Sequence, residues 1–320
     1  MTRAEPRRGL VVAVGSFDGV HLGHQQIINR AHELARSAAG VTAVLTFSPL
    51  AAQLVDSDFT FVLTPLPERV RLLACYGVSI IHVLRFDEAL RNSTAADFVR
   101  RHLVEPLQPA AVVVGHDHRF GRNGEGNVAT LHELLAPAGI WLEVVDEFQT
   151  LGAPVRSTRV REHLLLGHVQ LAARLLGRPY AVAGPVVTGT GIGRRLGFPT
   201  LNIHVPEREK LVPADGVYAA MIELHTTGQV SEPLPAAVNI GHRPTFGGER
   251  RTIEAHIISG QIPLSPDFAL LHFVDRIRPE LAFESAEQLA AQIRTDIEAV
   301  RLRLESAAAV LPACIFRRSV

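Results

Sequence analysis

In the first half of the chain, short apolar runs alternate with stretches in which apolar residues recur every three or four positions. The runs are rich in β-branched residues and predict strands at residues 10–14, 41–46, 79–84, 111–114 and 141–145. The stretches between them predict helices at residues 23–37, 67–75 and 127–135. Thr94 has the residue type of a helix N-cap, with Asp97 three positions later. Continuous apolar strands that alternate with helices predict an α/β fold, with a parallel sheet covered on both faces.

The pattern changes after about residue 180. Helical periodicity fades, and short strands broken by Gly and Pro are expected at residues 181–187, 217–223, 236–240, 252–258 and 269–274. Such spacing predicts a small antiparallel barrel. A last helix is expected to begin at Ser285, with Gln288 completing a capping box. Its apolar stripe, which we expect to face the barrel, comprises Leu289, Ile293, Ile297, Val300 and Leu304.

These patterns divide the chain into two domains and a tail. A length of 320 residues suits two domains. We place the boundary near residues 178–182, which gives a first domain at 1–180, a second at 181–305 and a loose tail at 306–320.

Composition restricts the function classes. Lys plus Arg and Asp plus Glu both number 32, so the chain lacks the broad positive field of a nucleic-acid binder. Lys210 is the sole lysine and has no glycine-rich loop beside it, which excludes a Walker-type phosphate loop and a pyridoxal-phosphate lysine elsewhere. Cys75 and Cys314 form no disulfide framework, which favours a reducing, cytoplasmic setting. The apolar run at 10–14 is too short for a signal peptide or a membrane span.

A first candidate site follows the first strand, where Gly15-Ser-Phe-Asp-Gly-Val-His-Leu-Gly-His24 leads into a helix. Its glycines allow a sharp turn, and free N–H groups at the helix start attract phosphate. His21 and His24 could donate hydrogen bonds to that phosphate. A surface pair or a metal pair is the alternative, although no Cys or Glu stands at zinc-ligand spacing.

This arrangement resembles the His-x-Gly-His nucleotidyltransferases, and specifically the prokaryotic bifunctional riboflavin kinase/FAD synthetases. Further segments resemble the same family: Gly115-His-Asp-His-Arg-Phe-Gly121, Val155-Arg-Ser-Thr-Arg-Val-Arg161 and the linker Leu176-Gly-Arg-Pro-Tyr180. The resemblance implies a Rossmann-like parallel-sheet domain that adenylylates FMN. The ATP site it implies comprises Gly15, Ser16, Phe17, Asp18, His21, His24, Asp117, Ser157, Thr158 and Arg161. Taken alone, Asp117 is equally a turn residue and Ser157 an ordinary N-cap.

A second candidate site lies in the barrel region, where Gly184-Pro-Val-Val-Thr-Gly-Thr-Gly-Ile-Gly193 leads to Gly197-Phe-Pro-Thr-Leu-Asn202. Backbone amides around Gly189, Gly191 and Gly193 could wrap an anion, although a flexible hairpin would explain the glycines equally well. We expect a strand-like segment, rather than a helix, after this loop.

The second loop closely resembles the riboflavin kinase signature, which implies a six-stranded antiparallel barrel followed by a C-terminal helix. By this resemblance Thr200 and Asn202 would contact Mg²⁺ and phosphate, Asn239 would bind ATP or flavin, and Glu254 would act as the base. Judged by spacing alone, Glu254 is an exposed strand carboxylate.

The chain departs from the family pattern at several positions. His118 stands where the family has Phe, and Arg156 stands where it has Ser. Thr46-Phe-Ser-Pro-Leu50 lacks a His-Pro pair, and Ser265-Pro266 stand near the position of a Tyr-Gly pair.

The predicted function is therefore bifunctional: MgATP-dependent phosphorylation of riboflavin to FMN, and then adenylylation of FMN to FAD with release of pyrophosphate. His21, His24, Arg161 and Glu254 are the candidate catalytic residues, Mg²⁺ is the expected cofactor, and ATP, riboflavin, FMN and FAD are the expected ligands. No nucleic acid, membrane or protein partner is implied. The alternatives are a monofunctional enzyme with one degenerate half and a flavin-nucleotide-binding regulator.

Overall fold

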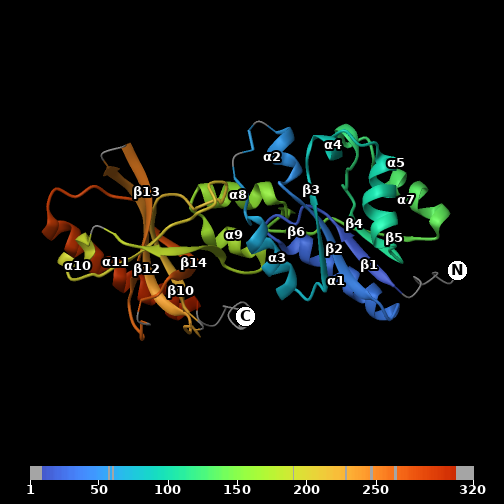
Figure 1. Ribbon diagram of the computed structural model, residues 1–320. Helices are drawn as coiled ribbons and strands as arrows, with labels where there is room; N and C mark the ends of the chain where they lie inside the picture. The colour runs from blue at the N-terminus through green and yellow to red at the C-terminus, as the bar shows by residue number, and fades with distance from the viewer. Residues whose placement is uncertain are drawn as a thin grey trace. The chain divides into compact units, whose positions relative to one another are not determined.

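The computed structural model describes residues 9–56, 58–59, 61–189, 191–227, 229–245, 248–262 and 265–307. The chain forms two compact units, Met1–Ser157 and Thr158–Val320 (Figure 1). Of the expected tail, residues 308–320 lie outside the described residues, as does Cys314.

The first unit is an α/β layer structure. Its strands are β1 (Leu10–Val14), β2 (Val41–Ser48), β3 (Ile80–Arg85), β4 (Ala111–Gly115), β5 (Trp141–Val145), β6 (Gln149–Thr150) and β7 (Ala153–Pro154). Its helical segments are α1 (Leu22–Ser37), α2 (Ala51–Val55), α3 (Leu66–Cys75), α4 (Glu88–Arg91), α5 (Ala95–Phe98), η1 (Val99–Val104), α6 (Glu105–Leu107), η2 (Arg122–Gly124), α7 (Val128–Leu135) and η3 (Ala136–Ala138). The predicted strands and the three predicted helices are thus confirmed within a few residues.

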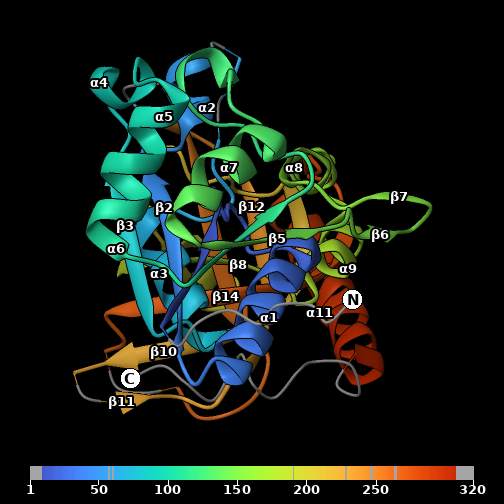
Figure 2. The same cartoon turned by 90° about the vertical axis from the view of Figure 1, so that its right-hand side faces the viewer.

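Five strands form one parallel sheet in the order β3-β2-β1-β4-β5, and the β6–β7 hairpin extends away from it (Figure 2). Alternate residues of β1 face opposite layers: Val11 and Ala13 contact the layer of α1 and α3, whereas Val12 and Val14 contact that of α5, η1 and α7. Burial on both faces explains why the strands read as continuous apolar runs. The strand order reverses between β1 and β4, which is where open α/β sheets hold ligands at their carboxyl ends.

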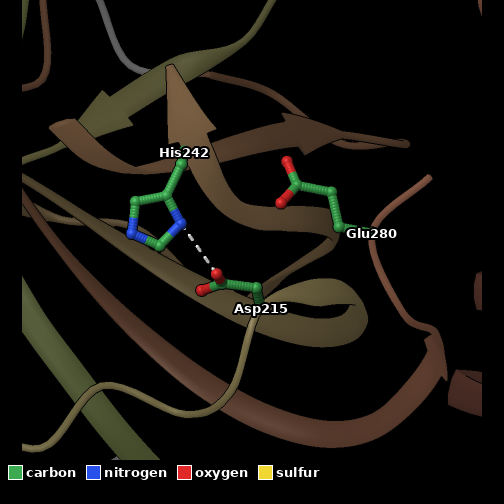
Figure 3. A group of neighbouring side chains, drawn as sticks. All are labelled: Asp215, His242 and Glu280. Atoms are coloured by element: carbon green, nitrogen blue, oxygen red, sulfur yellow. Dashed lines mark ion pairs between the residues drawn. The ribbon is translucent and has the colours of Figure 1, made fainter. Parts of the chain in front are cut away.

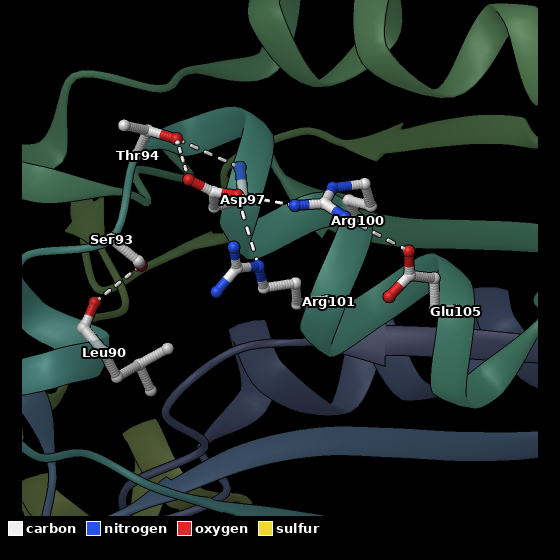
Figure 4. Close-up of polar contacts among 7 residues, drawn as sticks. All are labelled: Leu90, Ser93, Thr94, Asp97, Arg100, Arg101 and Glu105. Atoms are coloured by element: carbon white, nitrogen blue, oxygen red, sulfur yellow. Dashed lines mark hydrogen bonds and ion pairs between the residues drawn. The ribbon is translucent and has the colours of Figure 1, made fainter.

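The predicted cap at Thr94 is confirmed (Figure 4). The Thr94 hydroxyl accepts a hydrogen bond from the Asp97 amide at 3.1 Å and donates one to the Asp97 carboxylate at 3.0 Å. Asp97 also pairs with Arg100 at 2.9 Å and with Arg101 at 3.3 Å, and the hydrogen bond from Arg100 lowers the pKa of this carboxyl. Capping therefore fixes the start of the α5–η1 segment, whose Phe98 is buried against the sheet.

The second unit is built around a closed barrel. Its elements are α8 (Ser157–Leu165, which begins at the last residue of the first unit), α9 (Val169–Leu176), β8 (Tyr180–Val187), α10 (Ile192–Arg195), β9 (Leu201–Ile203), β10 (Gly216–Thr226), β11 (Gln229–Val230), β12 (Leu234–Thr245), β13 (Gly248–Ile257), β14 (Phe268–Arg278) and α11 (Ala286–Ala307). The strand order β10-β12-β13-β9-β8-β14 closes through the pairing of β14 with β10, and each of these pairings is antiparallel. This arrangement confirms the six-stranded barrel.

Two local expectations need correction. The glycine loop leads into a single helical turn, α10, before β9, and not directly into a strand-like segment. Gly191 takes a φ of +71° at its start, and the following residues can continue a helical turn as far as Gly197, whose φ is +87°. The start of α11 also differs: the Ser285 hydroxyl accepts from the Gln288 amide, but the Gln288 side chain accepts from the amide of Glu284 rather than that of Ser285. The stripe of α11 does face the barrel, where Val300 and Leu304 pack with Ala219.

Candidate active sites

The loop after β1 presents two stacked histidines. His21 caps the N-terminus of α1, and its Nδ1 accepts a hydrogen bond from the His24 amide at 3.3 Å. The two rings are nearly parallel with centroids 3.6 Å apart. A Cβ on Gly23 would stand 3.3 Å from the His21 ring, so glycine leaves the room this stack needs. Because Nδ1 of His21 accepts a hydrogen bond, the neutral ring carries its proton on Nε2. A hydrogen bond from this ring to an anion would therefore come from Nε2.

Buried hydrogen bonds that involve Asp18 and Thr64 hold the shape of this loop. Asp18 is only 1% exposed, and its carboxylate accepts hydrogen bonds from the amides of Leu63 and Thr64 and from the Thr64 hydroxyl. The same hydroxyl accepts from the Gly19 amide at 2.8 Å. The loop contains two non-glycine residues with positive φ, Phe17 at 51° and Val20 at 41°. Conformations of this kind persist only where surrounding contacts determine them, and such contacts are present here.

Arg69 completes the support. Its guanidinium is buried and donates to the carbonyls of Ser16 at 2.8 Å and Phe47 at 2.7 Å, and burial lowers its pKa. The hydroxyl of Ser157, the last residue of the first unit, donates to the carbonyl of Asp18 at 2.9 Å. Arg69 was not among the predicted site residues. The signal for it is its place between Leu66 and Leu73, where an arginine interrupts the buried side of α3.

The structure thus gathers most of the first predicted site at the carboxyl ends of β1 and β4. Gly15, Ser16, His21, His24 and Ser157 lie on the loop after β1 or against it. Phe17, Asp18 and His21 are buried. The expected contribution of Phe17 and Asp18 to ATP binding would come from the backbone and shape of the loop. Asp117 is exposed in the loop after β4. Thr158 and Arg161 belong to the second compact unit, and their role in this site stays a prediction.

The second site is a row of residues across three neighbouring strands. Glu254 on β13 is paired in register with Asn202 on β9 and with Asn239 on β12, so the three side chains share one face of the barrel wall. Glu254 is 8% exposed, and its carboxylate accepts a hydrogen bond from the Thr200 hydroxyl at 3.2 Å. Glu254, Asn239 and Thr200 line a cavity of about 330 Å³. An isolated strand carboxylate would not have these partners.

The glycine loop lies against this row. A Cβ on Gly189 would stand 2.2 Å from the amide nitrogen of Asn202, and one on Gly193 would stand 3.3 Å from the Thr200 hydroxyl oxygen. A Cβ at Gly189 would therefore overlap the Asn202 side chain, and one at Gly193 would overlap the carbonyl oxygen of Phe198, which it would approach to 2.4 Å. Thr200, Asn202 and Glu254 offer a hydroxyl, an amide and a carboxylate oxygen, the ligand chemistry that Mg²⁺ prefers. These residues therefore fit the expected metal.

Comparison with known proteins assigns both halves. Residues 3–159 match the family model described as FAD synthetase, and residues 176–304 match the one described as riboflavin kinase. The bifunctional riboflavin kinase/FMN adenylyltransferase of Escherichia coli (strain K12) is 36% identical over 292 residues, which cover 91% of each chain. That of Listeria monocytogenes is 34% identical over 294 residues, again 91% of each. The chain belongs to the bifunctional riboflavin kinase/FMN adenylyltransferase family. It is a transferase with both the kinase and the adenylyltransferase half.

A solved structure shares the fold along nearly the whole chain. The crystal structure described as a macrolide-efflux protein from Streptococcus pneumoniae superposes with a TM-score of 0.81 and 28% identity, covering 94% of this family member and 96% of that chain. Among the described residues of the present chain, no helix is both long enough and apolar enough to cross a bilayer.

The barrel of this family member also carries a cluster of metal-ligand residue types that was not predicted, and two of its members, His242 and Glu280, line the same cavity as Glu254 (Figure 3). One ligand atom each from Asp215, His242 and Glu280 lies within 4.8 Å of the other two. Asp215 already pairs with His242 at 2.9 Å and with Arg251 at 2.7 Å. Because Arg251 neutralises the carboxylate and also donates to the carbonyl of Val212, we assign this cluster to holding the segment before β10.

The single lysine is a structural residue in this fold. Lys210 is 3% exposed, and its Nζ lies 4.5 Å from the centroid of the Tyr180 ring. A buried ammonium over an aromatic face is a stabilising contact and is not open to a substrate carbonyl or phosphate.

Proposed function

We propose that the second unit transfers the γ-phosphoryl group of ATP to the primary hydroxyl of riboflavin, and that the first unit transfers the AMP moiety of ATP to the phosphate of FMN. The family assignment supports both reactions. The observation that carries the kinase half is the register row in which Glu254 stands between Asn202 and Asn239, with Thr200 at 3.2 Å. In sequence terms, we assign the motifs within residues 1–180 to the adenylyltransferase and those within 181–305 to the kinase, although α9, near the end of the first range, packs against the barrel as part of the second unit.

In the kinase cavity, Glu254 accepts the proton of the attacking hydroxyl or orients it, as phosphoryl transfer requires positioning and charge neutralisation more than covalent chemistry. Thr200 and Asn202 would hold Mg²⁺, which neutralises phosphate charge when bound. The glycine loop contributes backbone amides beside Asn202. These residues come from the barrel strands and the loop before β9, so one rigid wall presents the reacting groups.

In the first unit, an oxygen of the FMN phosphate attacks the α-phosphorus of ATP, the bond to the β-phosphate oxygen breaks, and pyrophosphate leaves. No covalent enzyme intermediate is needed. The Nε2–H of His21, together with His24, would stabilise the charge that develops on the leaving phosphates, and Ser157, Thr158 and Arg161 are proposed to assist. The position of the histidines at the N-terminus of α1 adds the favourable field of that helix end.

The test is a chromatographic product assay with ATP and Mg²⁺, started from riboflavin in one reaction and from FMN in another. We expect FMN and then FAD from riboflavin, and FAD from FMN. Formation of only one product would favour a monofunctional enzyme, and flavin binding without turnover would favour a regulator. We propose that this chain works in the cytoplasm, where it uses soluble ATP to make flavin nucleotides.

A further inference from the structure

Helix α11 has two halves with different surroundings. In the second half, Val300 and Leu304 are buried with Ala219 in a barrel-side core cluster. In the first half, Leu289 and Ile293 are only half-buried and line the cavity that contains Glu254. The helix is thus anchored at one end and forms a cavity wall at the other.

A buried ion pair stands where the two halves meet. Arg278, the last residue of β14, donates from Nε to Oδ1 of Asp296 at 2.9 Å and from Nη2 to Oδ2 at 2.8 Å. The side chains are 16% and 6% exposed, and both residues line the cavity. Gln292 donates to Oδ1 of Asp296 at 2.9 Å, and Nη1 of Arg278 donates to the carbonyl of Pro279. This forked geometry fixes both distance and orientation, which a single hydrogen bond would not do.

Arg278, the strand residue of this ion pair, lies in the same row of cross-strand partners as Glu254, the proposed base. Arg278 is paired with Val217 on β10, Val217 with Asn239 on β12, and Asn239 with Glu254 on β13. Asp296 therefore ties the helix to the strand row that carries the reacting groups. On the helix, Ile293 precedes Asp296 by three residues and Ile297 follows it, and both line the cavity.

We infer that Arg278 and Asp296 are positioning residues for riboflavin: their ion pair holds the first half of α11 at the spacing at which Leu289 and Ile293 close on the flavin. This inference rests on the proposed kinase function. The residues proposed for phosphoryl transfer lie on the barrel and its glycine loop, not on α11. Loosening the helix therefore weakens riboflavin binding and leaves the transfer step of bound substrate nearly intact.

The test uses the full chain with Asp296→Asn and Arg278→Lys. The first keeps the shape of the side chain but removes its charge, and the second keeps a charge but removes the fork. Arg303→Gln is the matched control, because Arg303 of α11 also pairs with β14, through Asp275 at 3.2 Å, but its side chain is 62% exposed and neither residue lines the cavity. The readouts are kcat, KM for riboflavin, and the riboflavin Kd from quenching of flavin fluorescence without ATP.

We expect Asp296→Asn to raise KM and Kd for riboflavin at least tenfold with kcat within threefold of wild type, Arg278→Lys to raise them less, and Arg303→Gln to leave them unchanged. A folded Asp296→Asn protein with unchanged Kd, or one that loses kcat at unchanged KM, overturns the inference. If thermal melting shows that Asp296→Asn does not fold, Arg278→Lys decides by the same criteria. A wild-type protein that binds riboflavin without phosphorylating it would refute the proposed function alone, since the Kd comparison needs no turnover.

Discussion

Replacing Thr64 by valine tests whether the hydrogen bonds of the Thr64 hydroxyl with Gly19 and Asp18 hold the loop after β1 in place. Valine has nearly the size of threonine but has no hydroxyl, so packing is preserved while two hydrogen bonds are lost. The Gly19 amide loses the oxygen that accepts from it at 2.8 Å in a buried position, and Asp18 loses one of its donors. Loss of a neutral buried hydrogen bond costs about 0.5–1.5 kcal/mol, and a hydrogen bond to a charged group contributes about 1.5–3 kcal/mol.

Asp18 keeps its backbone donors from Leu63 and Thr64, so the two losses do not add in full. We expect the free energy of unfolding of the first unit to fall by about 2–4 kcal/mol. Trp141, the sole tryptophan of the chain, lies on β5 of this unit, and its fluorescence reports guanidinium unfolding of the first unit specifically. Thr130→Val is the control, because within the described part of the chain the Thr130 hydroxyl is hydrogen-bonded only to the Asn127 side chain, at the start of α7.

The same substitution should reduce FAD formation from FMN at least tenfold, because small displacements of positioned groups are costly in catalysis. Without its anchor, the loop can relax from the positive φ values at Phe17 and Val20, which moves His21. FMN formation should stay at the wild-type rate. A Thr64→Val protein whose unfolding midpoint and FAD formation both match those of Thr130→Val would refute the reasoning.

Other expected outcomes concern individual side chains. His24→Ala should lower FAD formation about 10²–10³-fold while FMN formation persists; equal loss of both products would contradict two separate sites. Glu254→Gln should abolish riboflavin phosphorylation but leave FAD formation from FMN intact, as measured in the same assay. Gly189→Ala should disable the kinase without unfolding the barrel, because the new Cβ would meet Asn202 at 2.2 Å; a wild-type rate would show that the loop can give way. Burial lowers the pKa of His118 from 6.5 to about 4, so the unfolded chain binds a proton at a higher pH than the folded chain does. The free energy of unfolding should therefore fall as the pH drops through this range, by up to about 1.4 kcal/mol per pH unit. His118→Phe should remove this pH dependence in urea unfolding at pH 7 and pH 5, and an unchanged dependence would assign it to other groups.

The strands and caps could be predicted because their causes are local. Residues 141–145 form a strand within the limits expected from their apolar pattern, and Thr94 caps a helix through a residue three positions away. The strand pairings that close the predicted barrel could not be derived in the same way. Closure depends on pairing β10 with β14, for example Ile222 with Leu271, and on the three-residue strand β9, which is too short to have a period of its own.

Several supporting residues were missed for a related reason. Arg69 and Asp296 both lie on the apolar side of a helix, where a charge is costly unless a partner from another element meets it. The sequence marks such positions as unusual but does not name the partner. For Asp296 the partner is Arg278, and for Arg69 the partners are the carbonyls of Ser16 and Phe47. Residue types that suit a proposed chemical step are therefore easier to predict from the sequence than the residues that would hold them in place.

The limits of the second unit determine how the two activities could be produced as separate polypeptides. Helix α9 buries Val169, Ala172, Leu175 and Leu176, and it packs against β8 and β14 of the barrel. A fragment that ends at residue 180 would keep this helix but lose the strands that cover it. Its exposed apolar face would favour aggregation. Expression of a stand-alone kinase should therefore begin at or before residue 158, so that the barrel retains α8 and α9.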